Sequence, residues 1–200
     1  KMEDKTGLII LVKIIYWENE TAVELACSVL KNGGVIVYPT DTLYGFGCDA
    51  KNESAIEKIN AIKGRKAPMS VLAPNREIAA KWMTISQHEK NIVLEKLGGF
   101  TTIIVPVNDG ITSPSITGDK QTLGLRIPDH NFCQKLSEAY PNPITTTSVN
   151  RTRQEPLTTP EKILSEFSRE IDLIIEDGII EGSGSTIYNF QDRKLNIIRL

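Results

Sequence analysis

Apolar and polar positions follow one another along the chain in short blocks, and these blocks predict strands and helices in turn. Runs rich in Ile, Leu and Val that end at Gly, Pro or polar residues are typical of strands. Apolar residues at helical spacing behind a capping residue are typical of amphipathic helices. The predicted strands lie at 8–15, 35–38, 69–72, 101–105, 123–127, 144–147, 171–175, 185–188 and 195–198. The predicted helices lie between Thr21 and Gly33, between Asn52 and Ile62, and at 76–83, 88–97, 130–140 and 160–167.

The order of these elements predicts the fold class. Strands and helices intermix from one end of the chain to the other, which is the pattern of an α/β domain built around one mixed, twisted sheet with helices beside it. The segment 40–49 is predicted to be a loop. Because the chain has 200 residues and contains no internal repeat, low-complexity run or linker, we expect residues 1–200 to form a single domain.

Composition and charge remove several function classes. The formal net charge is −2, so any contact with nucleic acid has to come from a local basic patch. Cys27, Cys48 and Cys133 are widely spaced and form no C-x-x-C pair, which is typical of a reduced, cytoplasmic protein without a metal site. The most apolar run, 8–15, is much shorter than the ~20 residues that span a bilayer, so no membrane association is expected.

The densest group of unusual residues, Y-P-T-D-T-L-Y-G-F-G, lies at 38–47, directly after a predicted buried strand. In open α/β sheets, ligands collect at the carboxyl ends of strands. Two Thr hydroxyls, one carboxylate and two glycines offer small hydrogen-bonding groups and room for a close approach of the backbone. An ordinary turn has a similar composition, so the segment predicts either a binding loop or a turn.

A second group, K-G-R-K, follows the helix that ends near Ile62. Lys63 and Arg65 can point to the same side of a loop, where the guanidinium grips a phosphate through two hydrogen bonds and the ammonium adds a point charge. The G-x-x-x-x-G-K-[ST] loop is absent, so phosphates would be held by side chains from separate loops. The alternative is that these cations only complement the dipole of the helix.

A third group, T-T-T-S-V-N-R at 145–151, follows another short strand. Ser148 and Asn150 lie on the same side of an extended backbone, so both can face one cavity. A hydroxyl and an amide donate hydrogen bonds to a polyphosphate without adding charge. A capped turn explains the same residues equally well.

Two arginines stand at the ends of apolar strands. Arg126 follows L-G-L and precedes I-P, and Arg199 closes the last strand, while a G-S-G-S-T-I segment leads into the strand before it. A buried guanidinium needs an anionic partner. For Arg126 that partner is either a substrate carboxylate or phosphate, or an Asp or Glu of the chain itself.

Taken together and in this order, these groups resemble the YrdC/Sua5 family of threonylcarbamoyl-adenylate synthases. The resemblance runs from about Thr21 to Arg199. Its motifs in this chain are P-T-D-T-x-Y-G at 39–45, K-x-R at 63–65 followed by Pro68, G-x-R-I-P at 124–128, T-S-x-N at 147–150, and S-T-I at 185–187 before a terminal I-R.

The resemblance implies a set of site residues and a large concave cavity in the sheet. The residues implied to bind ATP are Lys63, Arg65, Thr122, Ser148, Asn150 and Arg199. Those implied to bind threonine are Thr42, Arg126, Thr146 and Ser185. Within the first set, Lys63 and Arg65 are also expected to be catalytic, because they would neutralise the charge that grows on pyrophosphate.

The resemblance further implies the reaction. ATP, L-threonine and bicarbonate would give threonylcarbamoyl-AMP and pyrophosphate, and the activated group would then pass to tRNA, either directly or through a threonylcarbamoyl-transfer complex. Mg²⁺ is expected to arrive with the triphosphate, because the chain shows no all-protein magnesium cage.

Two alternatives remain open. The chain could be a YrdC-like module that binds RNA or a nucleotide without catalysis, through a patch of Lys63, Arg65, Lys66, Arg151 and Arg153. It could also be a paralogue that uses a different carbamoyl acceptor, because Arg151-Thr152-Arg153 stands where the family usually has Ser-Gly soon after the Asn.

Overall fold

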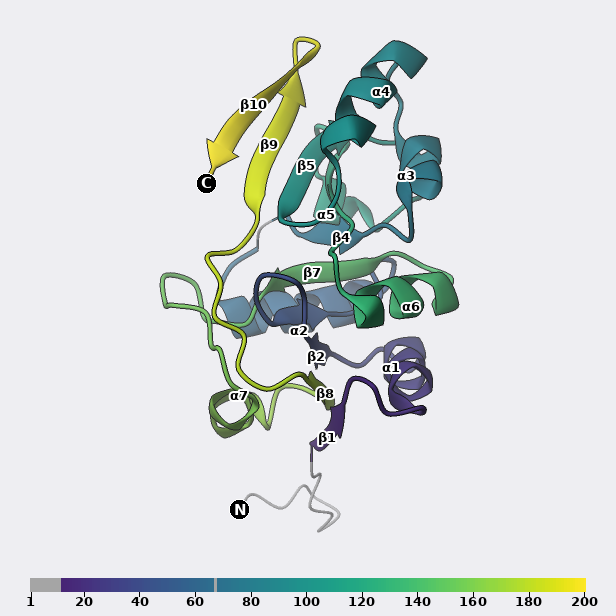
Figure 1. The fold of residues 1–200 in the computed structure, drawn as a ribbon. Helices are drawn as coiled ribbons and strands as arrows, with labels where there is room; N and C mark the ends of the chain where they lie inside the picture. Colours follow the sequence, from purple (N-terminus) through teal and green to yellow (C-terminus); the bar gives the residue numbers. More distant parts are fainter. Residues whose placement is uncertain (1–11, 67) are drawn as a thin grey trace.

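The computed structural model describes residues 12–66 and 68–200, and these residues form one mixed sheet with helices on both faces (Figure 1). The ten strands of the described residues lie in the order β1-β8-β2-β3-β7-β4-β6-β5-β9-β10. The sheet contains both parallel and antiparallel pairs, as with the parallel pair β4–β6 beside the antiparallel pair β4–β7. The mixed α/β sheet predicted from the order of elements is therefore confirmed.

The elements have the following bounds. The strands are β1 (Lys13–Tyr16), β2 (Ile36–Tyr38), β3 (Gly45–Gly47), β4 (Ser70–Leu72), β5 (Thr101–Pro106), β6 (Thr122–Arg126), β7 (Ile144–Ser148), β8 (Leu173–Glu176), β9 (Thr186–Gln191) and β10 (Lys194–Arg199). The helices are α1 (Ala22–Lys31), α2 (Glu53–Lys63), α3 (Arg76–Trp82), α4 (Gln87–Lys96), α5 (Pro114–Thr117), α6 (Asn131–Ala139) and α7 (Pro160–Phe167).

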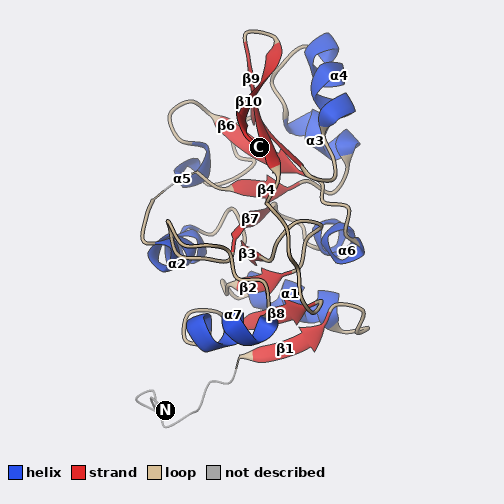
Figure 2. Cartoon of the chain, turned by 60° about the vertical axis from the view of Figure 1, so that its left-hand side comes forward, coloured by secondary structure: helices blue, strands red, loops and turns tan. Residues whose placement is uncertain are grey.

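The central strands are buried on both faces because a separate core packs against each. Alternate side chains of a strand point to opposite faces. Val35 and Val37 enter the core formed with α2 and α7, whereas Ile36 and Tyr38 enter the core formed with α1 and α6. Figure 2 shows these two pairs of helices on opposite sides of the strands. This double cover explains why the strand reads as a continuous apolar run.

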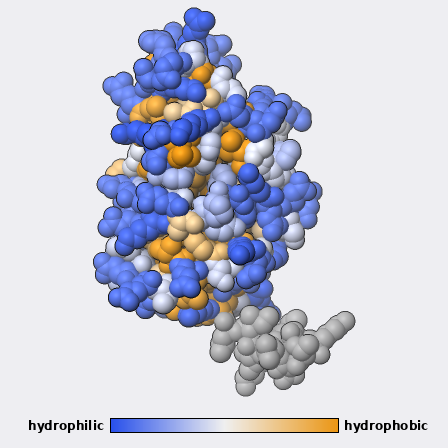
Figure 3. All heavy atoms as spheres, turned by 90° about the vertical axis from the view of Figure 1, so that its right-hand side faces the viewer, coloured by the Kyte–Doolittle hydropathy of each residue, from blue (hydrophilic) through white to orange (hydrophobic). Residues whose placement is uncertain are grey.

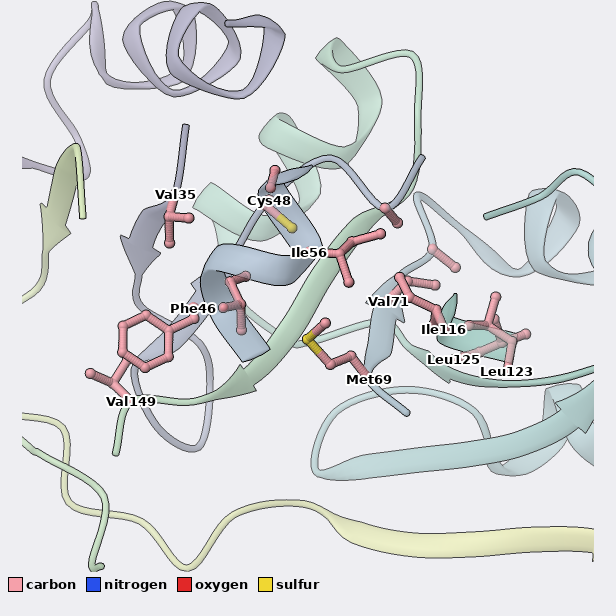
Figure 4. Packing of buried hydrophobic residues seen from close by; sticks show 14 of the residues in the cluster. Val35, Phe46, Cys48, Ile56, Met69, Val71, Ile116, Leu123, Leu125 and Val149 are labelled. Carbon is pink, nitrogen blue, oxygen red and sulfur yellow. The ribbon is translucent and has the colours of Figure 1, made fainter. Parts of the chain in front are cut away.

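The larger core continues along the sheet beneath the candidate site. Phe46 of β3 packs edge to face on Phe167 of α7, with ring centroids 5.1 Å apart. Ile56 of α2, Met69 and Val71 lie in the same core, and Figure 4 labels all three. Because well-packed interiors hold their side chains in single positions, this core fixes the ends of α2 and β7, which carry candidate site residues.

Helix α2 begins and ends where the sequence predicts. The side chain of Asn52 accepts a hydrogen bond from the Ala55 amide at 3.1 Å, and Gly64 closes the helix with a φ of 65°. Glycine adopts this left-handed conformation without the steric cost of a Cβ. Lys63 is thus the last residue of a capped helix.

Three local predictions differ from the structure. The expected loop at 40–49 contains strand β3, whose two glycines have low strand propensity. A Cβ on Gly47 would lie 2.7 Å from the Tyr38 ring, so the pairing of β2 with β3 requires glycine at this position. The hydroxyl of Thr21 does not cap α1 and bonds instead to Asn19 at 3.0 Å. Helix α5 was not predicted. Residues 8–11 of the first predicted strand lie outside the described residues.

The outer surface over α1, α3, α4 and α6 is mainly polar, with apolar residues in smaller patches between the charged ones (Figure 3). Within the described part of the chain, no helix is both long and apolar enough to cross a bilayer.

Candidate functional site

A cavity of about 270 Å³ opens where β3, β5, β6 and β7 meet the segments that precede β3 and β9. Its lining contains Thr and Ser hydroxyls from five different segments. Among the described residues it also contains three arginines, Arg65, Arg126 and Arg199, and no Asp or Glu. A chain with net charge −2 has therefore gathered positive charge in one concave place, which favours a ligand that carries negative charge.

The loop before β3 forms one wall of this cavity. The Thr40 hydroxyl accepts hydrogen bonds from the amides of Thr42 and Leu43 at 3.1 and 3.2 Å and donates to the Leu43 carbonyl at 2.7 Å, which folds the loop into a compact turn. The glycine-rich segment before β9 passes over it, and Gly182 lies so close to Thr42 that a Cβ there would collide with the Thr42 carbonyl oxygen. The segment 38–47 thus contains a turn that also lines the cavity, so the two alternatives, a binding loop and a turn, do not exclude each other.

All four residues implied to bind threonine line this cavity. They come from four elements or loops, and each is buried: Thr42, Arg126, Thr146 and Ser185. Thr102, which the sequence analysis did not single out, joins them, because its hydroxyl lies 2.7 Å from the Ser185 hydroxyl. Thr102 stands in an ordinary β-branched run and faces Arg126 only through the β5–β6 register, so no sequence signal marks it.

The structure pairs the buried guanidinium of Arg126 with a carboxylate of the chain itself. Its Nη2 donates to Asp41 Oδ1 at 2.6 Å and to the Thr42 hydroxyl at 2.9 Å, so the buried guanidinium has an anionic partner from the chain itself. The other Asp41 oxygen accepts from the Asp129 amide at 2.8 Å. Among the described residues, the Nε of Arg126 is buried and has no hydrogen-bond partner. Arg126 also lines the cavity, so its guanidinium can contact a ligand there.

Lys63, Ser148 and Asn150 form one hydrogen-bonded cluster. Lys63 Nζ donates to the Ser148 carbonyl at 2.8 Å and to Asn150 Oδ1 at 2.7 Å, and the Ser148 hydroxyl donates to the same Asn150 oxygen at 2.6 Å. Ser148 lines the cavity, as does Arg65, whose exposed side chain forms no ion pair with the described residues. Arg65 and Ser148 thus line the cavity, whereas Lys63 and Asn150 do not line it and are bonded to Ser148 behind its wall.

The ammonium of Lys63 is unusual because it is buried without a counter-charge. The residue is 5% exposed, and within residues 12–66 and 68–200 its hydrogen-bond acceptors are both uncharged. Burial, followed by repulsion from Arg65, lowers the pKa of Lys63 to about 8. A buried cation is costly unless an anion compensates it. The site therefore favours an incoming phosphate or carboxylate.

Comparison with known proteins identifies the family. A model of the Sua5/YciO/YrdC family, described as telomere recombination, matches residues 28–200. This chain belongs to that family.

Individual relatives agree with this assignment. A protein of Methanocaldococcus jannaschii is 32% identical over 198 residues, which are 98% of this chain and 93% of the relative. An Idiomarina loihiensis protein named threonylcarbamoyl-AMP synthase is 32% identical over 77% of this chain and 84% of its own length. Sua5 of P. abyssi, solved as a complex with L-threonine, superposes with a TM-score of 0.84 at 24% identity over 94% of this chain. The chain spans 57% of that Sua5 protein.

Two further residues implied by the likeness to this family lie in different places. Arg199 lines the cavity and donates from Nη2 to the Ser185 carbonyl at 2.9 Å. Burial and the nearby Arg126 lower the pKa of Arg199. Thr122 does not line the cavity: it starts β6 opposite Pro106, at the end of the strand away from Arg126. Its role as an ATP contact stays a prediction that this geometry does not support.

The basic patch that would suit an RNA-binding member of the family is smaller than the sequence suggests. Lys63 is buried in the cluster behind Ser148, and Arg151 is engaged with Glu170 through a contact of 2.7 Å. Arg65, Lys66 and Arg153 remain exposed. Arg153 has a φ of 71°, in the left-handed region that glycine adopts most easily.

Proposed function

We propose that this protein is a threonylcarbamoyl-AMP synthase that condenses ATP, L-threonine and bicarbonate and releases pyrophosphate. The observation that carries this proposal is the cavity itself, whose lining among the described residues has three arginines and a row of hydroxyls but no carboxylate, with the buried Lys63 bonded to the lining residue Ser148. Such a lining suits a polyphosphate and an amino-acid carboxylate held side by side. The names of the family's curated relatives support the same activity.

The threonine end of the cavity is proposed to lie at Arg126. Its guanidinium, which lines the cavity, can bind the substrate carboxylate, while Asp41 holds the group in place. Thr146 and Ser185 line the same cavity, and their hydroxyls would hydrogen-bond the substrate's own hydroxyl or amine. Since buried polar groups reject a substrate that cannot satisfy them, this arrangement would favour threonine over an apolar analogue such as valine.

The triphosphate end is proposed to lie at Lys63, Arg65, Ser148 and Asn150. Arg65 can approach the phosphates from the open side, and Lys63 can turn its ammonium from the Ser148 carbonyl toward them. Arg199, at the rim, offers a third cation. These groups come from α2, β7 and β10, so the polyphosphate would be held by side chains of separate segments, as the absence of a glycine-rich phosphate loop predicts.

The reaction needs no covalent intermediate on the protein. The amine of threonine adds to CO₂ derived from bicarbonate and loses a proton, which gives a carbamate. A carbamate oxygen then attacks the α-phosphorus of ATP, and the bond to the bridging oxygen breaks to release pyrophosphate. The protein's contribution is to hold the reactants together and to stabilise the charge that develops on the leaving group, which is the role of Lys63 and Arg65.

Magnesium is proposed to accompany ATP and not to be held by a protein cage. The cavity lining offers hydroxyls but no carboxylate, and no group of three or more His, Cys, Asp or Glu side chains in the described residues could hold a metal ion. Mg²⁺ commonly keeps its waters and binds through substrate phosphates. The metal would supply charge neutralisation on the triphosphate. We place the reaction in the cytoplasm, where ATP and the tRNA acceptor of the threonylcarbamoyl group meet.

A pyrophosphate-release assay tests the proposal and separates it from both alternatives. We expect release from ATP and Mg²⁺ only when threonine and bicarbonate are both present, with serine weaker and valine inactive. A different amino acid as the best stimulant would identify a paralogue with another carbamoyl acceptor. RNA binding that weakens steeply with salt, without any ATP turnover, would favour a binding module and contradict the proposed activity.

The pKa of Lys63 predicts a pH dependence for ATP use. The ammonium form binds phosphate, and its pKa in the free protein is about 8, so kcat/KM for ATP should fall as pH rises through about 8. Bound phosphates favour the charged form, so kcat should persist to a higher pH than kcat/KM. Steady-state rates at saturating threonine and a constant concentration of dissolved CO₂ measure both profiles. A kcat/KM for ATP that stays level well above that pH would contradict the role of Lys63.

A further inference from the structure

The loop that follows Asn150 carries a side chain with several tertiary contacts. Arg151 donates from Nη2 to Glu170 Oε2 at 2.7 Å and from Nη1 to Glu170 Oε1 at 3.4 Å, so the two planar groups meet as a fork. Its guanidinium also lies over the ring of Phe167, 5.1 Å from the centroid, and its Nε is 3.5 Å from Glu166. Helix α7 and the turn that follows it thus hold one side of Arg151.

The other side of Arg151 reaches the helix that ends at Lys63. Its Nη1 donates to the Ile62 carbonyl at 3.0 Å, one residue before Lys63. The next amide of the loop, that of Thr152, donates to the Lys63 carbonyl at 3.3 Å. The last carbonyls of a helix lack partners within the helix, and a cation there also complements the helix dipole. Arg151 therefore fastens the end of α2 to the loop that contains Asn150.

The same loop orients the amide of Asn150. Asn150 Nδ2 donates to the carbonyls of Arg151 and Gln154 at 3.0 and 2.6 Å. With its NH₂ group held in this way, Asn150 directs its oxygen to the ammonium of Lys63 and the hydroxyl of Ser148. The position of the Arg151 backbone thus sets the direction of a side chain at the triphosphate end of the cavity.

These contacts can orient Arg151 without adding much to the free energy of unfolding. Arg151, Glu166 and Glu170 have side chains that are each about one third exposed, at 38%, 34% and 33%. Ion pairs with this exposure contribute little to the free energy of unfolding. The guanidinium nevertheless has a fixed direction, because it pairs with Glu170, stacks on Phe167 and donates to the Ile62 carbonyl. Lysine cannot reproduce that geometry.

We propose that Arg151 is a positioning residue for the triphosphate site: its fork with Glu170 and its bond to the Ile62 carbonyl hold Lys63 and Asn150 in register with each other. The inference rests on the proposed function for the identity of the ligand. It assigns a role to the loop that follows Asn150. The side chain acts through Lys63 and Asn150 and touches neither substrate.

The test uses inorganic tripolyphosphate as a probe that requires no turnover. We expect Arg151→Lys to weaken tripolyphosphate binding, measured by calorimetry, by roughly tenfold, because small misplacements of a binding group have large effects. Glu170→Gln should weaken it in the same direction but less, since the side chain keeps one acceptor oxygen for the guanidinium and loses the other together with its charge. Arg193→Lys is the matched control, because Arg193 lies in the β9–β10 turn with an exposed side chain that contacts Glu89 of α4. This change should leave tripolyphosphate binding unaltered.

Activity measurements divide a positioning role from a merely structural one. For Arg151→Lys, KM for ATP should rise while KM for threonine stays within about twofold of the unaltered protein. Tripolyphosphate binding that is equal in Arg151→Lys, Glu170→Gln and the control would overturn the inference. So would a parallel rise in both KM values with a matching drop in Tm. If the unaltered protein binds tripolyphosphate and Arg151→Lys weakens that binding, but ATP is not turned over with threonine, the proposed function fails and the positioning role stands.

Discussion

Replacing Lys63 with methionine is expected to reduce threonine-dependent pyrophosphate release by roughly 100- to 1,000-fold, the effect of removing one donor that stabilises developing charge. The same change should not unfold the protein. The ammonium is buried beside Arg65 without a counter-charge, and its folded-state pKa of about 8 lies below its ordinary value, so the charged form is disfavoured in the fold. Below pH 8 the buried charge therefore costs stability, and that cost is relieved as pH rises toward the unfolded pKa.

Methionine has a similar length and no charge, so Lys63→Met should unfold at an equal or higher temperature, with a gain of about 1 kcal/mol at neutral pH. Thermal melts and the pyrophosphate assay measure the two effects. Lys58→Met is the matched control, because Lys58 lies on the same helix with its Nζ on the exposed side, bonded to the Gly33 carbonyl. A variant at Lys63 that keeps full activity, or that loses activity only because it unfolds, would refute the assignment.

Replacing Asp41 with alanine is expected to lower the free energy of unfolding by about 3 kcal/mol, because it leaves the guanidinium of Arg126 buried without its partner. The two side chains are 8% and 5% exposed and meet at 2.6 Å. The variant also loses the bond from the Asp129 amide. Urea unfolding of the purified variant measures the change, and threonine-dependent activity should fall with it, since Arg126 would lose its fixed direction at the cavity wall.

Two comparisons make this prediction specific. The double variant Asp41→Ala with Arg126→Met should be more stable than Asp41→Ala alone, because no unpaired charge remains. Glu77→Ala breaks an ion pair whose side chains are 64% and 77% exposed, and it should cost less than about 1 kcal/mol. If Asp41→Ala were as mild as Glu77→Ala, the pair would not hold Arg126 in place.

The sequence predicted most of the helices and strands, because capping and apolar spacing depend on neighbouring residues. Helix α2 has the capping residue, apolar spacing and terminal glycine that local energetics require, so its end at Lys63 was foreseeable. Strand β3 was not, because Gly45–Gly47 forms a strand only between β2 and β7, where Gly47 makes room for the Tyr38 ring. Strand β3 depends on pairing with β2 and β7, and this dependence leaves no pattern in the local sequence.

Only the tertiary structure decided which distant residues contact one another. From residue types alone, Arg126 could have served a substrate or a carboxylate of the chain, and the folded sheet brings it to Asp41, 85 positions away in the sequence. Lys63 meets Asn150 across 87 positions, and Thr102 meets Ser185 across 83. Local periodicity and capping depend on contacts within a few residues and can be read along the chain. Ion pairing and burial depend on strand order and register, which place Lys63 beside Asn150 and make Arg151 a link between them.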